Sequence, residues 1–317
     1  MTSAPNPRLA ESAVIIPTLD AGAHFPRLVA SLSAQGISPT QVLVIDSCSD
    51  DGSHAAATAA GYQLITIPRA EFNNGATRQL AAVHFPNAQF LIYLTQDAEP
   101  LPGAFSQLLA AFDDPTVAAA YGRQLPRPGA TPLEAYARLF NYPPQSRINS
   151  RDDLQRIGVR ACFFSNTFAA YRASALLQIG GFPTVIMAED ALAAARLLLA
   201  GWRTAYVSAA ECIHSHPYTL AQEFRRYFDT GVYHSLNPWL LAACGQPSGE
   251  GRRFVLSELA WLLRHAPLSI PYALARTTAK LAGYRLGRLE SHLSLKWCER
   301  LSLHKGYWRS PYTHRLK

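Results

Sequence analysis

Residues 90–100 read FLIYLTQDAEP, a run of five apolar residues that leads directly into Thr95-Gln96-Asp97. A short apolar run bounded by turn residues is typical of a fully buried strand. In open, mostly parallel sheets, ligands bind in the crevice outside the carboxyl ends of the strands. Asp97 stands at such an end, so the sequence predicts that its carboxylate faces a ligand.

Similar short apolar runs occur before and after this one, and segments with helical periodicity separate them. Strands alternating with helices are typical of βαβ units. The sequence therefore predicts an α/β fold with a Rossmann-like, mostly parallel sheet flanked by helices. We expect strands at 13–16, 42–45, 64–67, 90–94, 117–121 and 204–207, regular structure at 163–171, and helices at 25–32, 52–60, 77–83 and 191–200. Residues 123–153 are rich in Pro and Arg and are expected to form loops and short helices.

The C-terminal part of the chain differs in pattern and charge. Helical periodicity covers 223–233, 254–264 and 272–286, and the linker GQPSGEG marks the best internal boundary. We therefore predict an α/β domain over residues 1–245 and a basic amphipathic helical extension over residues 252–317. The extension carries thirteen Lys or Arg against three Glu, which gives +10, and the whole chain carries +7, which leaves −3 for the rest. This asymmetry indicates an anionic partner, and a solvated helical surface is the alternative.

Composition narrows the class of protein. Of the 317 residues, 49% are hydrophobic and 16% are charged, which is typical of a globular chain. We find no signal-peptide pattern and no apolar run of roughly 18 residues, the length that spans a bilayer. The five cysteines are widely spaced without a CxxC pair, so we expect free thiols. These features predict a cytoplasmic protein.

Two further strand ends carry polar residues suited to a ligand. Asp46 and Ser47 open the stretch DSCSDDGS, and Asp46 could accept a hydrogen bond from a nucleobase or a ribose hydroxyl. The alternative is capping of the next helix by Ser49 or Asp50. Arg78 lies one turn into a helix after Asn-Asn-Gly, where it could clamp phosphates, with a surface ion pair as the alternative.

Carboxylates and histidines could supply the chemistry. Asp97 would suit Mg²⁺ or Mn²⁺ that bridges a nucleotide diphosphate, although capping of the next helix is an alternative. Glu189 and Asp190 open a helix after a glycine-rich turn, where one of them could act as a general base or both could cap the helix dipole. His214 and His216 alternate on an extended segment, so their side chains point the same way and could meet a metal or a diphosphate.

Taken together, these motifs resemble GT-A glycosyltransferases of family 2, specifically the bacterial rhamnosyltransferases of O-antigen and other polysaccharides. Six stretches match in chain order between about residues 13 and 235. They are VIIPTLDAG, VLVIDSCSDDGS, EFNNGATRQLA, FLIYLTQDAEP, YRASALLQIGGFP with AEDALAAARLLLAGWRTAYVSAA, and HSHPYTLAQEFRRYFDTGVYH.

The resemblance implies roles for individual residues. Most of the wider family ends this strand in Asp-x-Asp, whereas the rhamnosyl branch is similar to this chain in reading TQDA, with Thr95 in place of the first acid. Asp190 is then the general base, and Asp97 and His216 are the candidate ligands of Mg²⁺ or Mn²⁺. Cys48 stands where a glycine is usual, and Asn74-Gly75-Ala76 where His-Gly-Gly is commoner. The implied nucleotide-sugar-binding residues are Pro17, Thr18, Asp20, Asp46, Ser47, Arg78, Gln96, Asp97 and Glu189.

The implied activity is inverting transfer of a sugar, with L-rhamnose from dTDP-L-rhamnose as the donor, to a hydroxyl of a lipid-linked or polysaccharide acceptor. Transfer of a hexose from a UDP-sugar is the alternative within the same class. A non-catalytic, membrane-associated assembly protein is a different alternative, and it predicts loss of carboxylates that this chain retains. A nicotinamide oxidoreductase would show GxGxxG after the first strand, where this chain has PTLDAGAHF.

The expected partners follow from this activity and from the basic extension. They are the nucleotide-sugar donor, the lipid-linked or glycan acceptor, and an anionic membrane surface at the inner face of the cell membrane, where the protein would be peripheral. No nucleic acid is expected, and a homo-oligomer is left open.

Overall fold

One mixed sheet forms the centre of the protein. The computed structural model describes residues 7–245 and 249–314, and within them nine strands join in the order β3-β2-β1-β4-β8-β6-β9-β5, with β7 paired to β9. β3, β2, β1 and β4 are parallel, β6 and β9 are parallel to each other, and β8 runs against both of its neighbours. The strands are β1 (Ser12–Thr18), β2 (Val42–Asp46), β3 (Gln63–Thr66), β4 (Phe90–Leu94), β5 (Glu99–Pro100), β6 (Val117–Leu125), β7 (Arg147–Asn149), β8 (Phe168–Arg172) and β9 (Arg203–Ile213).

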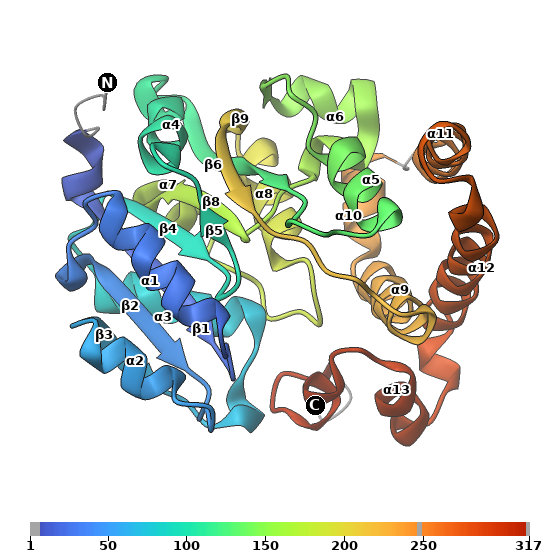
Figure 1. The fold of residues 1–317 in the computed structure, drawn as a ribbon, viewed down its shortest axis with the longest axis horizontal. Coiled ribbons are helices and arrows are strands. Elements are labelled where there is room, and N and C mark those ends of the chain that lie inside the picture. Colours follow the sequence, from blue (N-terminus) through green and yellow to red (C-terminus); the bar gives the residue numbers. More distant parts are fainter. Residues whose placement is uncertain (1–6, 246–248, 315–317) are drawn as a thin grey trace.

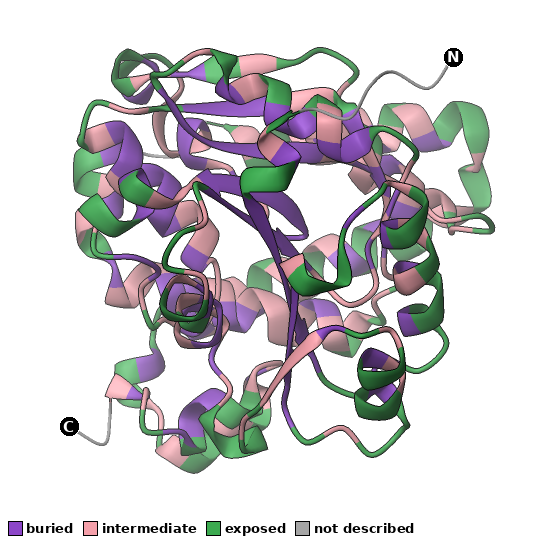
Figure 2. Cartoon of the chain, turned by 90° about the vertical axis from the view of Figure 1, so that its left-hand side faces the viewer, coloured by how far each residue is buried: buried purple, intermediate pink, exposed green. Residues whose placement is uncertain are grey.

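Helices cover both faces of this sheet (Figure 1). Because successive side chains of a strand point to opposite faces, Val14 and Ile16 pack in one cluster, and Ala13 and Ile15 pack in the other. Both faces are therefore buried, and the strands lie in the buried centre in Figure 2. The helices of this part are α1 (His24–Ala34), α2 (Ser53–Ala59), α3 (Asn74–His84), α4 (Ala104–Ala110), α5 (Pro132–Asn141), α6 (Arg151–Ile157), α7 (Ala173–Gln178) and α8 (Glu189–Leu199). The predicted α/β class is confirmed.

Some element boundaries differ from the expectation. Regular structure does not begin at residue 163, because β8 starts at Phe168. The strand expected at 204–207 continues to Ile213 after an irregularity in its pairing with β6, and the polar residues Ser208 and Glu211 concealed that continuation. The Pro- and Arg-rich segment contains a ten-residue helix, α5, which begins with a capping box between Thr131 and Glu134.

The C-terminal helices pack on the rest of the protein. They are α9 (Leu220–Leu236), α10 (Pro238–Cys244), α11 (Glu250–His265), α12 (Ile270–Gly287) and α13 (Leu295–Leu301). Trp308 is buried, and Phe254 and Trp261 lie against the ring of Tyr136 in α5. Part of the apolar surface of the predicted extension therefore packs internally. No helix among the described residues is both long enough and apolar enough to cross a bilayer.

Glycines allow α9 and α12 to touch backbone to backbone. A Cβ atom added at Gly283 would lie 2.2 Å from the carbonyl oxygen of Phe224, and one added at Gly287 would lie 2.0 Å from that of Phe228. Beside this contact, Arg276 lies between Glu223 and Glu258, and all three side chains are buried. Small residues and a buried charge network thus fix the position of α12.

The glycine contact gives a stability prediction. Gly283→Ala should lower the free energy of unfolding by about 1–3 kcal/mol, because the new methyl group meets backbone atoms that cannot rotate away. The matched control is Gly251→Ala, where the added Cβ meets no atom within 4 Å. The measurement is the thermal unfolding midpoint of both variants. Equal midpoints for Gly283→Ala and the control would contradict the close packing.

Candidate active site

Three potential metal ligands converge where β4 and β9 end. The Oδ2 atom of Asp97 lies 3.2 Å from Nε2 of His216 and 3.5 Å from Nε2 of His214. The two Nε2 atoms are 3.0 Å apart. One carboxylate and two imidazoles within 4.8 Å of one another could hold a divalent cation. The sequence predicted that both histidines could meet a metal, and the family resemblance assigned only His216 together with Asp97. In the structure His214 lies in the same cluster.

The pairing of β5 with the end of β9 brings these residues together. Glu99 and Pro100 of β5 pair with Ile213 and Cys212, so the histidines that follow Ile213 return to Asp97. The residue between the histidines, Ser215, is held by donating to the buried Glu134 at 2.5 Å. α4 begins at Ala104 after Gly103, so Asp97 does not cap it.

The hydrogen bonds of His214 determine which nitrogen faces the carboxylate. Oε1 of Gln124 lies 2.9 Å from Nδ1 of His214 and also accepts from Arg138. Because a guanidinium only donates, the Gln124 atom shared by both must be the oxygen, and Nδ1 of His214 is the donor to it. This second contact orients the ring so that Nε2 faces Asp97 and His216.

The protonation of the cluster suits a cation. Burial opposes the charge on Asp97, but the hydrogen bond and charge of His214, with the charge of His216, hold the pKa of Asp97 below its usual range. Burial, with the nearby charge of His214, lowers the pKa of His216 to about 4, so its imidazole is neutral at pH 7. A divalent cation would take the place of the proton that His214 shares with Asp97, because metal ligands bind in their deprotonated form.

Asp190 lies in the first turn of α8 with a perturbed carboxyl group. Its oxygens accept from the backbone N–H of Asn166 at 3.0 Å and from that of Ala191 at 2.8 Å. Burial, followed by the charge of Glu189, raises the pKa of Asp190 to about 7 despite these bonds. The preceding Ala188 adopts φ +60°, a strained conformation of the kind that persists where surrounding structure enforces it. A carboxylate with a pKa near neutrality suits a general base.

Arg78 forms an ion pair with Glu189, the residue that precedes Asp190 in the chain. Nη1 of Arg78 lies 2.9 Å from Oε1 of Glu189, and the two residues are only 5% and 4% exposed. Asn166 donates to the same Glu189 oxygen at 3.1 Å. In the structure Arg78 and Glu189 form a buried ion pair that positions the start of α8, and their contact with the nucleotide sugar stays a prediction.

The start of α3 is locked to the loop that precedes α8. A Cβ atom at Gly75 would lie 2.0 Å from the carbonyl oxygen of Pro183, so only glycine fits there. Asn73 caps α3 and donates to the carbonyl oxygen of Val185 at 3.0 Å, and Gln79 accepts from the N–H of Phe182. The Asn-Asn-Gly motif thus supports the loop that carries Asp190.

The metal-ligand cluster and the base lie on adjoining backbone. Thr95 lies two residues before Asp97 in the chain. Its N–H donates to the carbonyl oxygen of Thr167 at 3.1 Å. Thr167 directly follows Asn166, whose N–H holds Asp190. Asp97 and Asp190 are therefore connected through neighbouring segments at one edge of the sheet.

Five of the nine expected nucleotide-sugar-binding residues lie at or just after the ends of β1 and β2, namely Pro17, Thr18, Asp20, Asp46 and Ser47. Thr18 and Asp46 are direct partners across these strands, and Pro17 precedes Thr18. Asp46 accepts from the N–H of Ser49 at 3.1 Å, and the Oγ atom of the buried Ser47 has no hydrogen-bond partner among the described residues. Gln96 makes two hydrogen bonds to the backbone of Leu19, which fix the end of β4 beside the end of β1.

Arg69 joins this region and was not anticipated from the sequence. Its Nη2 atom lies 3.2 Å from Asp20 and 2.7 Å from Asp50, and it also donates to the carbonyl oxygen of Cys48. Cys48, in place of the usual glycine, adopts φ +58°, a strained conformation that these contacts accompany. No local sequence signal marks Arg69, because its partners come from two other loops.

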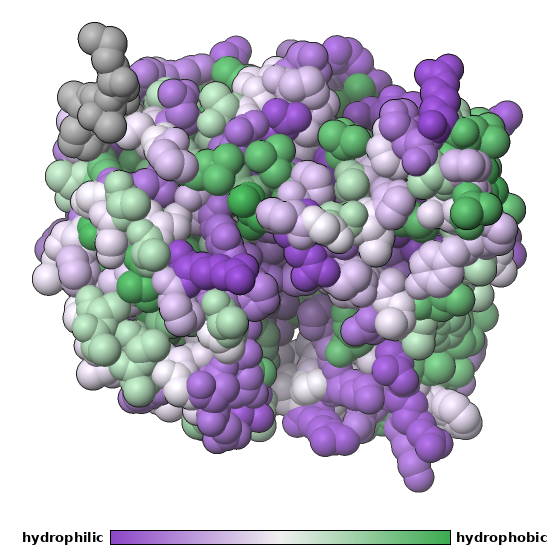
Figure 3. Space-filling view, in the orientation of Figure 1, coloured by the Kyte–Doolittle hydropathy of each residue, from purple (hydrophilic) through white to green (hydrophobic). Residues whose placement is uncertain are grey.

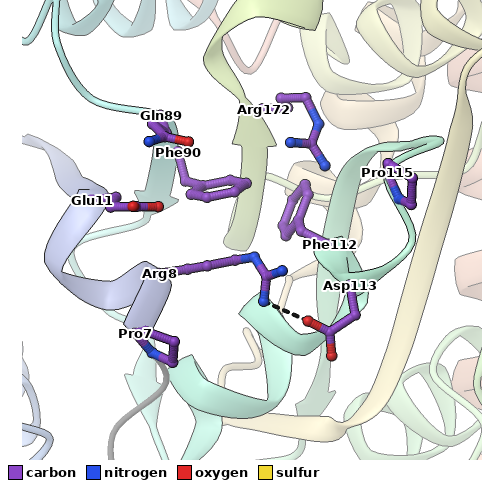
Figure 4. A pocket seen from close by; sticks show the side chains of 9 residues that line it. All are labelled: Pro7, Arg8, Glu11, Gln89, Phe90, Phe112, Asp113, Pro115 and Arg172. Atoms are coloured by element: carbon purple, nitrogen blue, oxygen red, sulfur yellow. Dashed lines mark hydrogen bonds and ion pairs between the residues drawn. The ribbon is translucent and has the colours of Figure 1, made fainter.

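A pocket of about 520 Å³ lies elsewhere, at the amino ends of β1 and β4 (Figure 4). Phe90 begins β4 and is paired with Arg172 at the end of β8. This is the edge of the sheet opposite Asp97, so the pocket does not belong to the candidate site. Its lining residues are Pro7, Arg8, Glu11, Gln89, Phe90, Phe112, Asp113, Pro115 and Arg172.

Comparison with solved structures identifies the fold. The mannosyltransferase PcManGT from Pyrobaculum calidifontis, in complex with GDP-Man and Mn²⁺, superposes with a TM-score of 0.55 at 20% identity over 96% of this chain and 87% of that chain. TarS 1–349 of S. aureus in complex with UDP-GlcNAc superposes with a TM-score of 0.51 at 15% identity, over 96% of this chain and 89% of that chain. At these identities the likeness shows the fold alone, and it confirms the predicted GT-A architecture.

Comparison of sequences identifies the family. The model of Glycosyl transferase family 2 matches residues 13–180. The chain is 43% identical to the O-antigen chain rhamnosyltransferase WbaN of Salmonella anatum over 94% of this chain and 95% of that protein. It is 42% identical to RfbN, an O-antigen chain rhamnosyltransferase of Salmonella typhimurium LT2, over 94% and 96%. Matches of this extent show that the chain belongs to glycosyltransferase family 2 and is an enzyme that transfers a sugar.

Proposed function

We propose that the enzyme transfers L-rhamnose from dTDP-L-rhamnose, with inversion at C1, to a hydroxyl of a lipid-linked or polysaccharide acceptor in the cytoplasm. The observation that carries the chemistry is the pairing of a base whose pKa is about 7 with a carboxylate-histidine cluster on adjoining backbone. The choice of sugar is supported by identity to two O-antigen chain rhamnosyltransferases along almost the whole chain.

Asp190 performs the proton transfer in this proposal. Its ionised carboxylate takes the proton of the acceptor hydroxyl, and that oxygen forms a bond to C1 of the sugar from the face opposite the diphosphate. The bond between C1 and the diphosphate oxygen breaks, and the nucleoside diphosphate leaves with the bonding electron pair. The N–H groups of Asn166 and Ala191 keep the carboxylate oxygens in place during this step.

Asp97, His214 and His216 would hold Mg²⁺ or Mn²⁺ beside the diphosphate. When bound, the ion supplies positive charge that stabilises the negative charge developing on the leaving group. Gln124 and Arg138 orient His214, and Glu134 fixes the loop between the histidines through Ser215. The retained carboxylates at Asp97 and Asp190 argue against a non-catalytic assembly role.

The ends of β1 and β2 would take the nucleoside. Asp46 and Asp20 offer carboxylate acceptors to base N–H and ribose hydroxyl groups. The Oγ atom of Ser47, which has no hydrogen-bond partner among the described residues, directly follows Asp46 in the chain. Arg69 would restrain Asp20 for this contact. Arg78 and Glu189 contribute by positioning Asp190, since their charges already satisfy each other.

A donor panel tests the proposed specificity. With Mn²⁺ present, dTDP-L-rhamnose should raise the thermal unfolding midpoint more than dTDP-glucose, UDP-glucose, UDP-GlcNAc or GDP-mannose at equal concentration, because bound ligand stabilises the folded state. Excess EDTA should remove most of that increase. A larger increase with a UDP-hexose would replace the rhamnosyl proposal with the alternative donor, whereas an EDTA-resistant increase would remove the metal from it.

Replacing the base tests the mechanism. Asp190→Asn should lower turnover about 10²-fold or more while leaving donor binding nearly unchanged. In the wild type, kcat/KM should fall as pH drops below about 7, because the protonated carboxyl cannot accept a proton. The matched control is Asp152→Asn, an exposed carboxylate on α6.

Stability gives an independent reading of the same variant. The folded-state pKa of Asp190 is raised above the value of 3.8 for a free side chain, so its ionisation destabilises the folded protein as pH rises through about 7. Asp190→Asn should therefore unfold no more easily than wild type at pH 8.

In the transfer assay, near-normal turnover by Asp190→Asn would exclude Asp190 as the base.

A further inference from the structure

The exposed side of α11 and α12 combines apolar and basic residues. Leu256 and Leu263 on α11 are 56% and 65% exposed, and Leu274 and Leu281 on α12 are 48% and 49% exposed. Each pair is seven residues apart, so it lies along one face of its helix. Leu268, in the turn between the helices, is 96% exposed. We call these five leucines, together with the exposed Arg252, Arg264, Arg285 and Arg288, the outer face.

The outer face is visible as an edge of the molecule. Figure 1 places α11 and α12 along the right-hand side, and Figure 3 shows apolar residues gathered at that edge with hydrophilic ones among them. On neighbouring α13, Trp297 is 54% exposed, with the guanidinium of Arg300 over its ring at 5.5 Å. An amphipathic aromatic residue of this kind is typical of the boundary between water and lipid.

Acidic residues of this region do not offset its positive charge at the surface. Glu258 and Glu290 are 1% and 3% exposed, and Glu258 is neutralised by Arg276. Glu250 pairs with Arg160 and Arg253, and Glu299 pairs with Arg309. Among the described residues, no ion pair involves the exposed Arg252, Arg264, Arg285, Arg288 or Lys296.

From this arrangement we infer that the outer face docks the enzyme on an anionic lipid bilayer. The basic side chains attract anionic headgroups, and the leucines, led by Leu268 at the tip of the hairpin, insert among the acyl chains. A second copy of the chain fits the same face poorly. Two outer faces brought together would place like charges opposite each other without exposed carboxylates to balance them.

The other part of the extension explains why this face stays available. Phe254 and Trp261 are engaged by Tyr136, and the backbone contact of α12 with α9 occupies the opposite side of that helix. The leucines of the outer face therefore remain exposed after the core has formed. This inference does not rest on the donor or the reaction proposed above.

Sedimentation with vesicles tests the inference on the full chain. At 50 mM NaCl the wild type should pellet with phosphatidylcholine vesicles that contain phosphatidylglycerol and stay in solution with pure phosphatidylcholine. Raising NaCl to 500 mM should weaken binding by about tenfold or more, because salt screens the charge attraction. A wild type that stays in solution with anionic vesicles at low salt would overturn the inference.

Matched substitutions locate the surface. Leu263→Glu with Leu268→Glu should weaken vesicle binding by about tenfold or more. The control is Val83→Glu with Leu177→Glu, since these side chains on α3 and α7 are 77% and 73% exposed on another side of the protein, and it should bind as wild type does. Circular dichroism checks that both double variants are folded. Arg252→Gln with Arg264→Gln and Arg285→Gln is a second test that leaves every leucine in place, with the same expected loss.

Analytical ultracentrifugation shows whether a second copy of the chain, instead of a bilayer, covers the outer face. The wild type and the Leu263→Glu, Leu268→Glu variant should sediment as the same species. A wild-type dimer that this variant converts to a monomer would assign the face to a second copy and overturn the bilayer inference. Unchanged vesicle binding by both the leucine and the arginine variants would overturn it as well.

Discussion

The buried pair of Arg78 and Glu189 is the interaction on which the catalytic half of the protein depends. It joins α3 to α8 with both side chains almost fully removed from water. Breaking such a pair by removing one partner typically costs about 3–5 kcal/mol, because the remaining charge is left buried and uncompensated. The charge of Glu189 is, after burial, the second cause of the raised pKa of Asp190, and the charge of Arg78 opposes it. The same contact therefore positions the start of α8 and places two opposing charges beside Asp190.

The second half of the site depends on the length of β9. Its continuation past residue 207 returns the chain to β5 and delivers His214 and His216 to Asp97. Thr95 stands where much of the family has an acid, and its backbone N–H ties this half to the segment that holds Asp190. In our account, the two imidazoles supply the ligands that the missing carboxylate would otherwise provide.

The sequence predicted those parts of the fold that depend on local pattern. The strands near 13–16, 42–45 and 90–94 are continuous buried apolar runs, and the polar residues after them lie at one edge of the sheet. The extent of β9 was concealed because Ser208 and Glu211 interrupt the apolar run. The length of α5 was concealed by the prolines and arginines around it.

Contacts between distant segments could not be read from the sequence. Arg78 appeared suited to phosphate because nothing local indicates that Glu189 neutralises it. Gln124 and Arg69 lack any motif, and each acquires its role from loops far away in the chain. The charge of the extension was visible in composition, but only the fold shows that its glutamates are paired and its outer leucines are exposed.

The central claim is that one carboxylate and two histidines hold the ion that meets the diphosphate. The most direct measurement is anomalous diffraction from crystals grown with Mn²⁺ and dTDP. The account predicts a single strong manganese peak within coordinating distance of Asp97, His214 and His216, with the diphosphate bound to the same ion. A peak at the acidic cluster of Asp20 and Asp50 instead, or a well-ordered diphosphate without manganese beside Asp97, would contradict it.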